Sequence, residues 1–142
     1  MRRVVVTGLG AITPIGNNVK DMWEAVQNGV CGIAPITLYP TEDRKVKLAG
    51  EVKNYQPEDY MEKRDAKKMD RFTQFAMIAA DEAIEDSGIN LEECDTDRCG
   101  IIVSSGIGGL STIQREDCKG YEKGYDRVSP HFIPMSISNM AA

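Results

Sequence analysis

The hydrophobic pattern of this chain alternates between short β-branched runs and longer stretches with helical periodicity. Residues 3–7 form an apolar, β-branched run that predicts a strand. The apolar run within residues 99–103 has the composition of a strand that is buried on both faces. Residues 46–53 alternate apolar and polar positions, which predicts a half-exposed strand. The pattern therefore predicts three strands spread along the chain.

Helical signals fall between these strands. Asn18, with Asp21 three residues later, predicts a capped helix start, and Gly29 predicts its end in a left-handed conformation. The strongest helical stretch is 71–87, which is apolar almost all round in its first half and is followed by Gly88. The face expected to be buried in the first helix has helical spacing and consists of Val19, Met22, Trp23 and Val26.

The remaining segments complete an alternating order of strands and helices. A helix start is predicted at Pro57, another helix over 109–122, an irregular stretch over 124–135, and a further helix opening at Ser136. Strands alternating with helices predict an α/β fold in which crossover helices cover a largely parallel sheet. We expect one domain over residues 1–142, and the abrupt stop in an opening helix predicts that it is the front portion of a longer protein.

Composition narrows the functional classes. The 142 residues are 42% hydrophobic and 27% charged, with a net charge of −5, which argues against nonspecific nucleic-acid binding by the whole molecule. No segment approaches the roughly 20 apolar residues of a membrane-spanning helix, and Gly8 interrupts the apolar start too early for a signal peptide. We therefore expect a cytoplasmic protein without membrane insertion.

The cysteines and the histidine do not form a recognisable metal-binding or catalytic motif. The four cysteines form no CxxC pair, and His131 is the only histidine, so we expect reduced thiols and no metal site. A lone histidine between Pro130 and Phe132 is more often structural than catalytic.

The first glycine cluster, Gly8-Leu9-Gly10, invites a dinucleotide-binding interpretation. That fingerprint needs a glycine where Thr13 stands and a helix beginning at the turn, but Pro14 and Gly16 delay the helix. A nucleotide-binding α/β domain is therefore the disfavoured alternative.

A second glycine cluster, residues 106–109, directly follows the apolar run 99–103. Glycines allow a sharp turn and close backbone packing, and they leave Ile107 as one large apolar side chain among them. This pattern predicts a strand end that presents bare backbone and a gate-like side chain to a ligand.

A cationic stretch occupies residues 63–71. On a helix, Arg64, Lys67 and Lys68 share one exposed face. The stretch is either a solvated helix face or a dock for an acidic partner, because clustered cations attract anionic ligands.

Several segments together resemble one family over essentially all 142 residues. The chain is similar to the N-terminal part of the bacterial β-ketoacyl-acyl-carrier-protein synthases, the type II condensing enzymes of fatty-acid elongation. The matching segments are Arg2–Gly10, Thr13–Gly16, Ala49–Val52, Lys68–Gln74, Gly106–Gly109, Ser129–Pro130 and Pro134–Ala142.

This resemblance implies the N-terminal α/β half of a thiolase-like fold, incomplete here, in a homodimer. Such enzymes accept an acyl chain from acyl carrier protein onto a cysteine, decarboxylate malonyl-carrier protein with the help of two histidines, and join the two. Backbone amides form an oxyanion hole. All three catalytic side chains lie beyond Ala142, so none is expected in this chain. No cofactor is implied apart from the phosphopantetheine arm of the carrier.

The resemblance also assigns roles to individual residues. Ile107 matches the acyl-pocket residue that must move for long chains, and Phe132 and Ile133 match positions that reach the partner's acyl pocket. His131 stands where the family usually has Phe. The basic positions of the carrier-protein docking surface match Arg64, Lys67, Lys68 and Arg127. A non-catalytic, chain-length-determining homologue stays open as the alternative.

Overall fold

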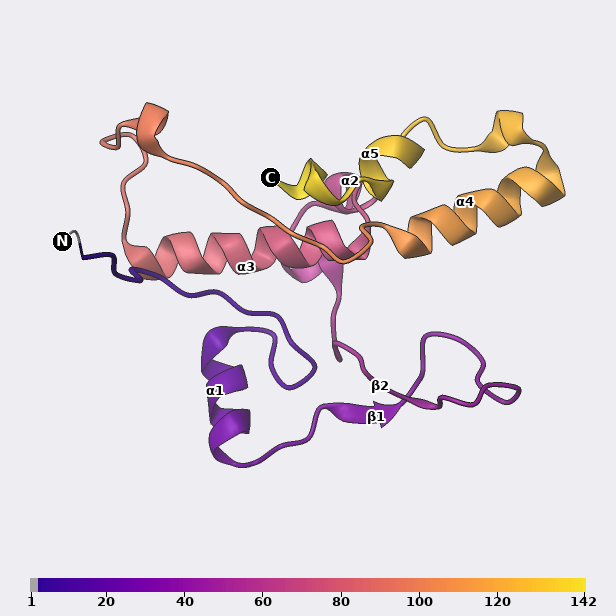
Figure 1. The fold of residues 1–142 in the computed structure, drawn as a ribbon, viewed down its shortest axis with the longest axis horizontal. Helices are drawn as coiled ribbons and strands as arrows, with labels where there is room; N and C mark the ends of the chain where they lie inside the picture. The colour runs from indigo at the N-terminus through magenta and orange to yellow at the C-terminus, as the bar shows by residue number, and fades with distance from the viewer. Residues whose placement is uncertain (1–2) are drawn as a thin grey trace. The chain divides into compact units, whose positions relative to one another are not determined.

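The structure is a computed structural model, and it describes residues 3–142. Figure 1 shows its helices and its one pair of strands among the described residues. The α-helices are α1 (Val19–Gln27), α2 (Lys63–Ala66), α3 (Arg71–Ser87), α4 (Leu110–Lys123) and α5 (Phe132–Ser136). The strands are β1 (Ile33–Pro35) and β2 (Leu48–Gly50), and the 3-10 turns are η1 (Pro57–Asp59), η2 (Thr96–Arg98), η3 (Tyr125–Arg127) and η4 (Ser138–Ala141).

The chain divides into two compact units that share α3. The first unit takes the described residues up to Tyr55 together with Ile78–Gly88, and the second takes Gln56–Met77 with Ile89–Ala142. In the first unit β1 and β2 pair antiparallel, with Ala34 opposite Ala49. None of the described helices is long and apolar enough to cross a bilayer.

In the first unit, the N-terminal segment lies directly on the second half of α3. A Cβ atom on Gly8 would collide with the carbonyl oxygen of Ala83, and one on Gly10 with that of Ala79. The two glycines are thus needed for close contact between backbone and helix, which explains the Gly8-Leu9-Gly10 pattern without a bound nucleotide.

The second unit has a largely polar interior. Ala66 and Met135 are its buried apolar side chains, whereas its buried polar side chains are Asp70, Thr73, Gln74, Thr112 and Glu116. The Gln74 side-chain amide donates to the carbonyl oxygen of Ala66 at 2.8 Å, and this bond joins α2 to α3. Hydrogen bonds between side chains and backbone therefore hold much of this unit together.

The predicted helix boundaries agree closely with the structure. The Asn18 side chain accepts a hydrogen bond from the Asp21 amide at 2.8 Å, which confirms the predicted cap of α1. Helix α3 spans the predicted residues 71–87, and Gly29 and Gly88 both have positive φ angles after their helices. The start predicted at Pro57 is the 3-10 turn η1.

The strand predictions were less successful. Residues 3–7 and 99–103 are extended but pair with no strand among the residues described, and Val4 and Ile102 are 94% and 96% exposed. A strand exists only where a neighbour completes its hydrogen-bond ladder, so an apolar run alone does not make one. The predicted strand over 46–53 is limited to β2, whose partner β1 lies in a stretch expected to be loop.

The C-terminal expectation was also wrong: the stretch 124–135, expected to be irregular, contains the turn η3 and most of helix α5. Ser136 ends helix α5 instead of opening a helix, and the turn η4 follows it. The Ser136 hydroxyl donates to the carbonyl oxygen of Phe132 at 2.6 Å, so this serine closes the last turn of the helix.

Candidate functional site

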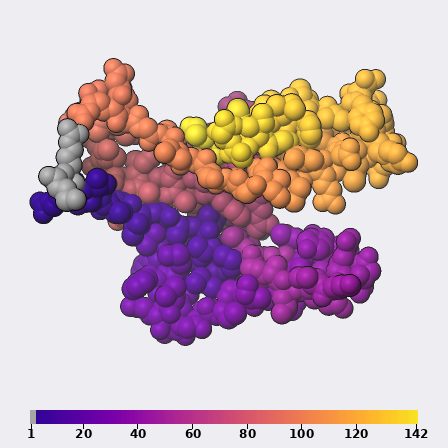
Figure 2. Space-filling view, viewed as in Figure 1, coloured from indigo at the N-terminus to yellow at the C-terminus, as the bar shows by residue number. Residues whose placement is uncertain are grey.

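The glycine segment 106–109 is seated on the C-terminal end of α5. The Gly109 amide donates to the carbonyl oxygen of Ser136 at 3.0 Å. A Cβ atom on Gly108 would collide with the same oxygen, and one on Gly109 with the carbonyl oxygen of Met135. Gly108 also has a φ of +88°, a left-handed conformation that favours glycine. Figure 2 shows the C-terminal segment packed against the start of α4.

The three residues expected in an acyl pocket are therefore carried by two elements in contact. Ile107 directly precedes the two packed glycines, and Phe132 and Ile133 form the first turn of α5. Ile107 and Ile133 are 64% and 57% exposed, and Phe132 is half-buried. The backbone under Ile107 is thus held in place while the side chain projects outward.

Two buried carboxylates that sequence reasoning missed support these elements. The first is Asp70, which is 7% exposed and lies just before α3. One of its oxygens, Oδ2, accepts hydrogen bonds from the amide and the hydroxyl of Thr112 at 3.0 and 2.6 Å. The other, Oδ1, accepts a long bond of 3.4 Å from the Phe72 amide. The sequence marks Lys68-Met69-Asp70-Arg71 by its charge and by its match to the family, but neither signal predicts that Asp70 is buried.

The second is Glu116, which is 5% exposed and lies on α4. Its Oε2 accepts bonds from the Ser129 amide at 2.8 Å and from the Lys119 ammonium at 3.1 Å, and Arg115 pairs with Oε1 at 3.3 Å. The bond from Ser129, followed by that from Lys119, lowers the pKa of Glu116 below its ordinary value. Glu116 thus ties α4 to the segment that leads into α5.

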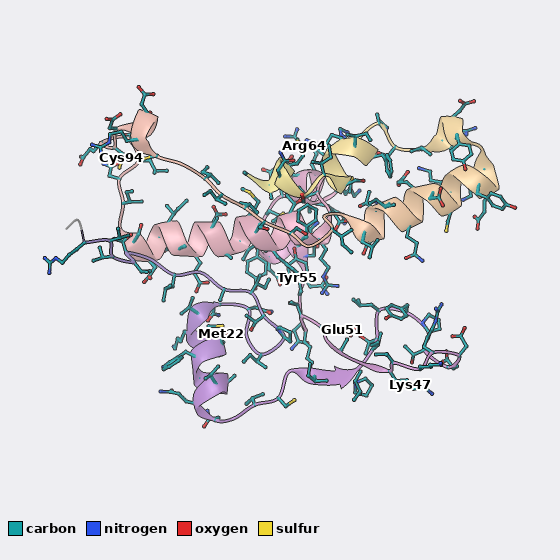
Figure 3. The ribbon with its side chains drawn as sticks, in the orientation of Figure 1. Met22, Lys47, Glu51, Tyr55, Arg64 and Cys94 are labelled. Atoms are coloured by element: carbon teal, nitrogen blue, oxygen red, sulfur yellow. The ribbon has the colours of Figure 1, made fainter. Side chains whose placement is uncertain are left out.

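The cationic cluster, defined as Arg64, Lys67 and Lys68, lies on and just after the short helix α2, and all three side chains are exposed. Figure 3 shows Arg64 on this helix. Asp65 pairs with Lys68 at 3.0 Å and with Arg64 at 3.6 Å. Lys68, and then Arg64, hold the pKa of Asp65 below its ordinary value. The cluster therefore presents three cations against one carboxylate.

Arg127, the fourth expected docking residue, does not lie beside the cationic cluster. It lies in η3, beyond the C-terminal end of α4, whereas α2 and α5 lie near the N-terminal end (Figure 1). Arg127 is exposed, and the structure leaves its predicted docking role untested.

The first unit contains a separate hollow of about 390 Å³, lined by Leu9, Val19, Lys20, Glu82, Glu85 and Asp86. Glu82 and Asp86 already accept backbone hydrogen bonds here, from Ala11 and Val19 and from Leu9 respectively. None of the residues predicted for a site lines this hollow, and two of its carboxylates, Glu82 and Asp86, serve the fold.

The remaining candidates show no constellation of reactive groups. The four cysteines are free thiols, three of them exposed and Cys94 half-buried. His131 is exposed at the start of α5, where its amide donates to the Ser129 hydroxyl and its side chain makes no capping bond. Among residues 3–142 there is no cluster of three metal-ligating side chains.

Comparison with known proteins identifies the family. Residues 1–142 match the family described as Beta-ketoacyl synthase, N-terminal domain. A 3-oxoacyl-acyl-carrier-protein synthase 2 of Staphylococcus aureus strain COL is 49% identical over 140 residues, which make up 99% of this chain and 34% of that relative.

Solved structures agree. The ishigamide ketosynthase/chain length factor has a TM-score of 0.81 at 26% identity, over 99% of this chain and 35% of that one. A type II PKS ketosynthase in complex with its acyl-carrier protein has a TM-score of 0.77 at 23% identity, over 96% of this chain and 35% of that one. The chain thus spans about a third of the length of these relatives, and the expected thiolase-like fold class is confirmed. The chain belongs to the β-ketoacyl synthase family, whose N-terminal domain it matches along its whole length.

Proposed function

We propose that the protein of which this chain forms the N-terminal part is an elongating 3-oxoacyl-acyl-carrier-protein synthase. A cysteine thiolate outside this chain takes the acyl group from the phosphopantetheine thioester of one carrier and releases the carrier thiol. Malonyl-carrier protein then loses carbon dioxide, and the resulting carbanion attacks the acyl-enzyme thioester. The products are 3-oxoacyl-carrier protein, two carbons longer, and the regenerated cysteine.

The observation that carries this proposal is the 49% identity to a 3-oxoacyl-acyl-carrier-protein synthase 2 across nearly the whole chain. The placement of the expected pocket residues is compatible with it. The segment that carries Ile107 packs on the C-terminal end of α5, the helix whose first turn carries Phe132 and Ile133. In a homodimer, Phe132 and Ile133 would contribute to the partner's pocket, and the proposed location is the cytoplasm.

The chain's own part in the reaction is binding. Ile107 limits entry of long acyl chains, and the cationic cluster attracts the acidic carrier protein, assisted by Arg127. The carrier's phosphopantetheine arm supplies the thioester, and no other cofactor is required.

Two experiments on the full-length protein test the proposal. The first incubates it with acyl- and malonyl-carrier proteins and follows the acyl-enzyme and the elongated product by mass spectrometry. An Ile107→Phe variant should form the acyl-enzyme with short chains and fail with long ones, because the larger side chain would narrow the proposed acyl pocket. If the wild-type protein forms neither acyl-enzyme nor product, the proposed reaction is refuted.

The second experiment tests docking. Reversing Arg64, Lys67 and Lys68 to Glu should weaken carrier binding about tenfold or more at low salt, with a smaller difference at high salt. The matched control reverses three exposed lysines of the first unit, Lys45, Lys47 and Lys53, and makes the same change in net charge. Equal weakening by both triple variants would show that net charge, and not the cluster, governs binding.

A second candidate is a non-catalytic, chain-length-determining partner. It is favoured by the likeness to the ishigamide ketosynthase/chain length factor. Such a protein would keep the pocket and the dimer surface without a nucleophile. Acylation of a cysteine outside this chain by acyl-carrier protein supports the enzyme, whereas its absence, with a stable complex with a catalytic homologue, supports the partner.

A further inference from the structure

The helix that follows the glycine segment lacks a cap of its own. Helix α4 begins at Leu110, and its N-cap position is Gly109, which has no side chain to accept a bond from the first-turn amides. Glycine is required there because a Cβ atom would collide with the carbonyl oxygen of Met135. Close packing on α5 and ordinary capping of α4 are therefore incompatible at this residue.

Asp70 supplies the missing cap from another part of the sequence. Its Oδ2 accepts the amide of Thr112, in the first turn of α4, at 3.0 Å, and the hydroxyl of the same residue at 2.6 Å. Thr112 is fully buried, and Asp70 is nearly so. A carboxylate at a helix N-terminus gains from both charge-assisted hydrogen bonds and the helix dipole.

The same carboxylate reaches the glycine segment itself. A Cβ atom on Gly109 would stand 3.1 Å from Asp70 Oδ2, so this oxygen lies close to the backbone of Gly109, two residues after Ile107. The Gly109 amide is also bonded to the carbonyl oxygen of Ser136, at the end of α5. The segment is therefore held by contacts to both Asp70 and α5, while the Ile107 side chain is 64% exposed.

We propose that Asp70 is a positioning residue for acyl-chain selection: through Thr112 it fixes the backbone of residues 108–112 and so limits how far Ile107 can withdraw. This inference rests on the proposed function. With the backbone held, long chains enter only by rotation of the Ile107 side chain. When Asp70 is replaced by a neutral residue, the backbone of residues 108–112 can move together with Ile107.

The test is a rescue experiment in the full-length protein. Ile107→Phe should block acylation by long-chain acyl-carrier protein, and adding Asp70→Asn should restore it about tenfold, which is the effect of weakening one charge-assisted bond by about 1.4 kcal/mol. A gain of activity cannot result from misfolding. Asp117→Asn on the exposed face of α4 is the matched control, and combined with Ile107→Phe it should restore nothing.

Hydrogen–deuterium exchange provides a readout independent of activity. Asp70→Asn and Thr112→Val should both speed exchange of the amides at residues 109–112 about tenfold, whereas Thr112→Ser should retain wild-type protection because it keeps the hydroxyl. If the double variant stays as blocked as Ile107→Phe alone, the inference is overturned. Unchanged exchange in Asp70→Asn would overturn it too. A wild-type protein that forms no acyl-enzyme with any chain refutes the proposed function and this inference together.

Discussion

Glu82 on α3 accepts two backbone hydrogen bonds at once, and this makes its substitution informative. Its Oε2 accepts the Ala11 amide and its Oε1 the Val19 amide, each at 2.8 Å. Val19 is the first residue of α1, so its amide has no partner within that helix. One side chain therefore holds the N-terminal segment and the start of α1 on α3.

The size of the effect follows from this geometry. A hydrogen bond to a charged acceptor contributes about 1.5–3 kcal/mol, and the lower figure applies because Glu82 is only half-buried. Glu82→Ala removes both bonds and should lower the stability of this contact by about 3 kcal/mol. Glu82→Gln keeps one acceptor oxygen and should cost about half as much.

Hydrogen–deuterium exchange of the full-length protein measures this cost at the two amides. Since about 1.4 kcal/mol corresponds to a factor of ten, Glu82→Ala should speed exchange of Ala11 and Val19 about 100-fold, and Glu82→Gln about tenfold. The control is Glu85→Ala, which removes an exposed carboxylate from the same hollow.

The reasoning fails if Glu82→Ala and Glu85→Ala change exchange equally, because the effect would then come from the general loss of charge. It also fails if Glu82→Gln leaves both amides as protected as in the wild type. Either result would show that the two bonds do not hold the segment.

Three further changes are predicted. Because the pKa of Glu116 lies below its ordinary value of 4.5, its contribution to stability should be present above that pH and be lost as the pH falls through the depressed pKa. The protection factor of the Ser129 amide, which is its exchange rate corrected for the intrinsic rate at each pH, should therefore fall in acid for the wild type and for the control Glu122→Gln, but lose this pH dependence in Glu116→Gln. Gly10→Ala should lower the stability of the full-length protein in urea by about 1–3 kcal/mol, because its Cβ would collide with Ala79. Gly29→Ala should lower the stability in urea by only about 1 kcal/mol, because its site is open and only its positive φ opposes the change. A larger loss of stability for Gly29→Ala than for Gly10→Ala would contradict this reasoning.

Helix capping shows what could be predicted from neighbouring residues. The bond between Asn18 and Asp21, the left-handed Gly29 and Gly88, and the bounds of α3 all depend on residues within one or two turns. The cap of α4 is different, because Gly109 has no capping side chain and Asp70 lies 42 residues from Thr112. No local pattern marks Asp70 as the cap.

The amino-acid sequence by itself determined the family, the helices α1, α3 and α4, and the residues expected to bind an acyl group and its carrier. Only the tertiary structure decided that residues 3–7 and 99–103 are unpaired among the described residues, that β1 pairs with β2, and that Asp70 and Glu82 hold distant backbone amides. Helical hydrogen bonds close within four residues and are encoded locally. Strand ladders and buried carboxylate bonds need partners brought from far along the chain, and their formation depends on how the whole chain packs.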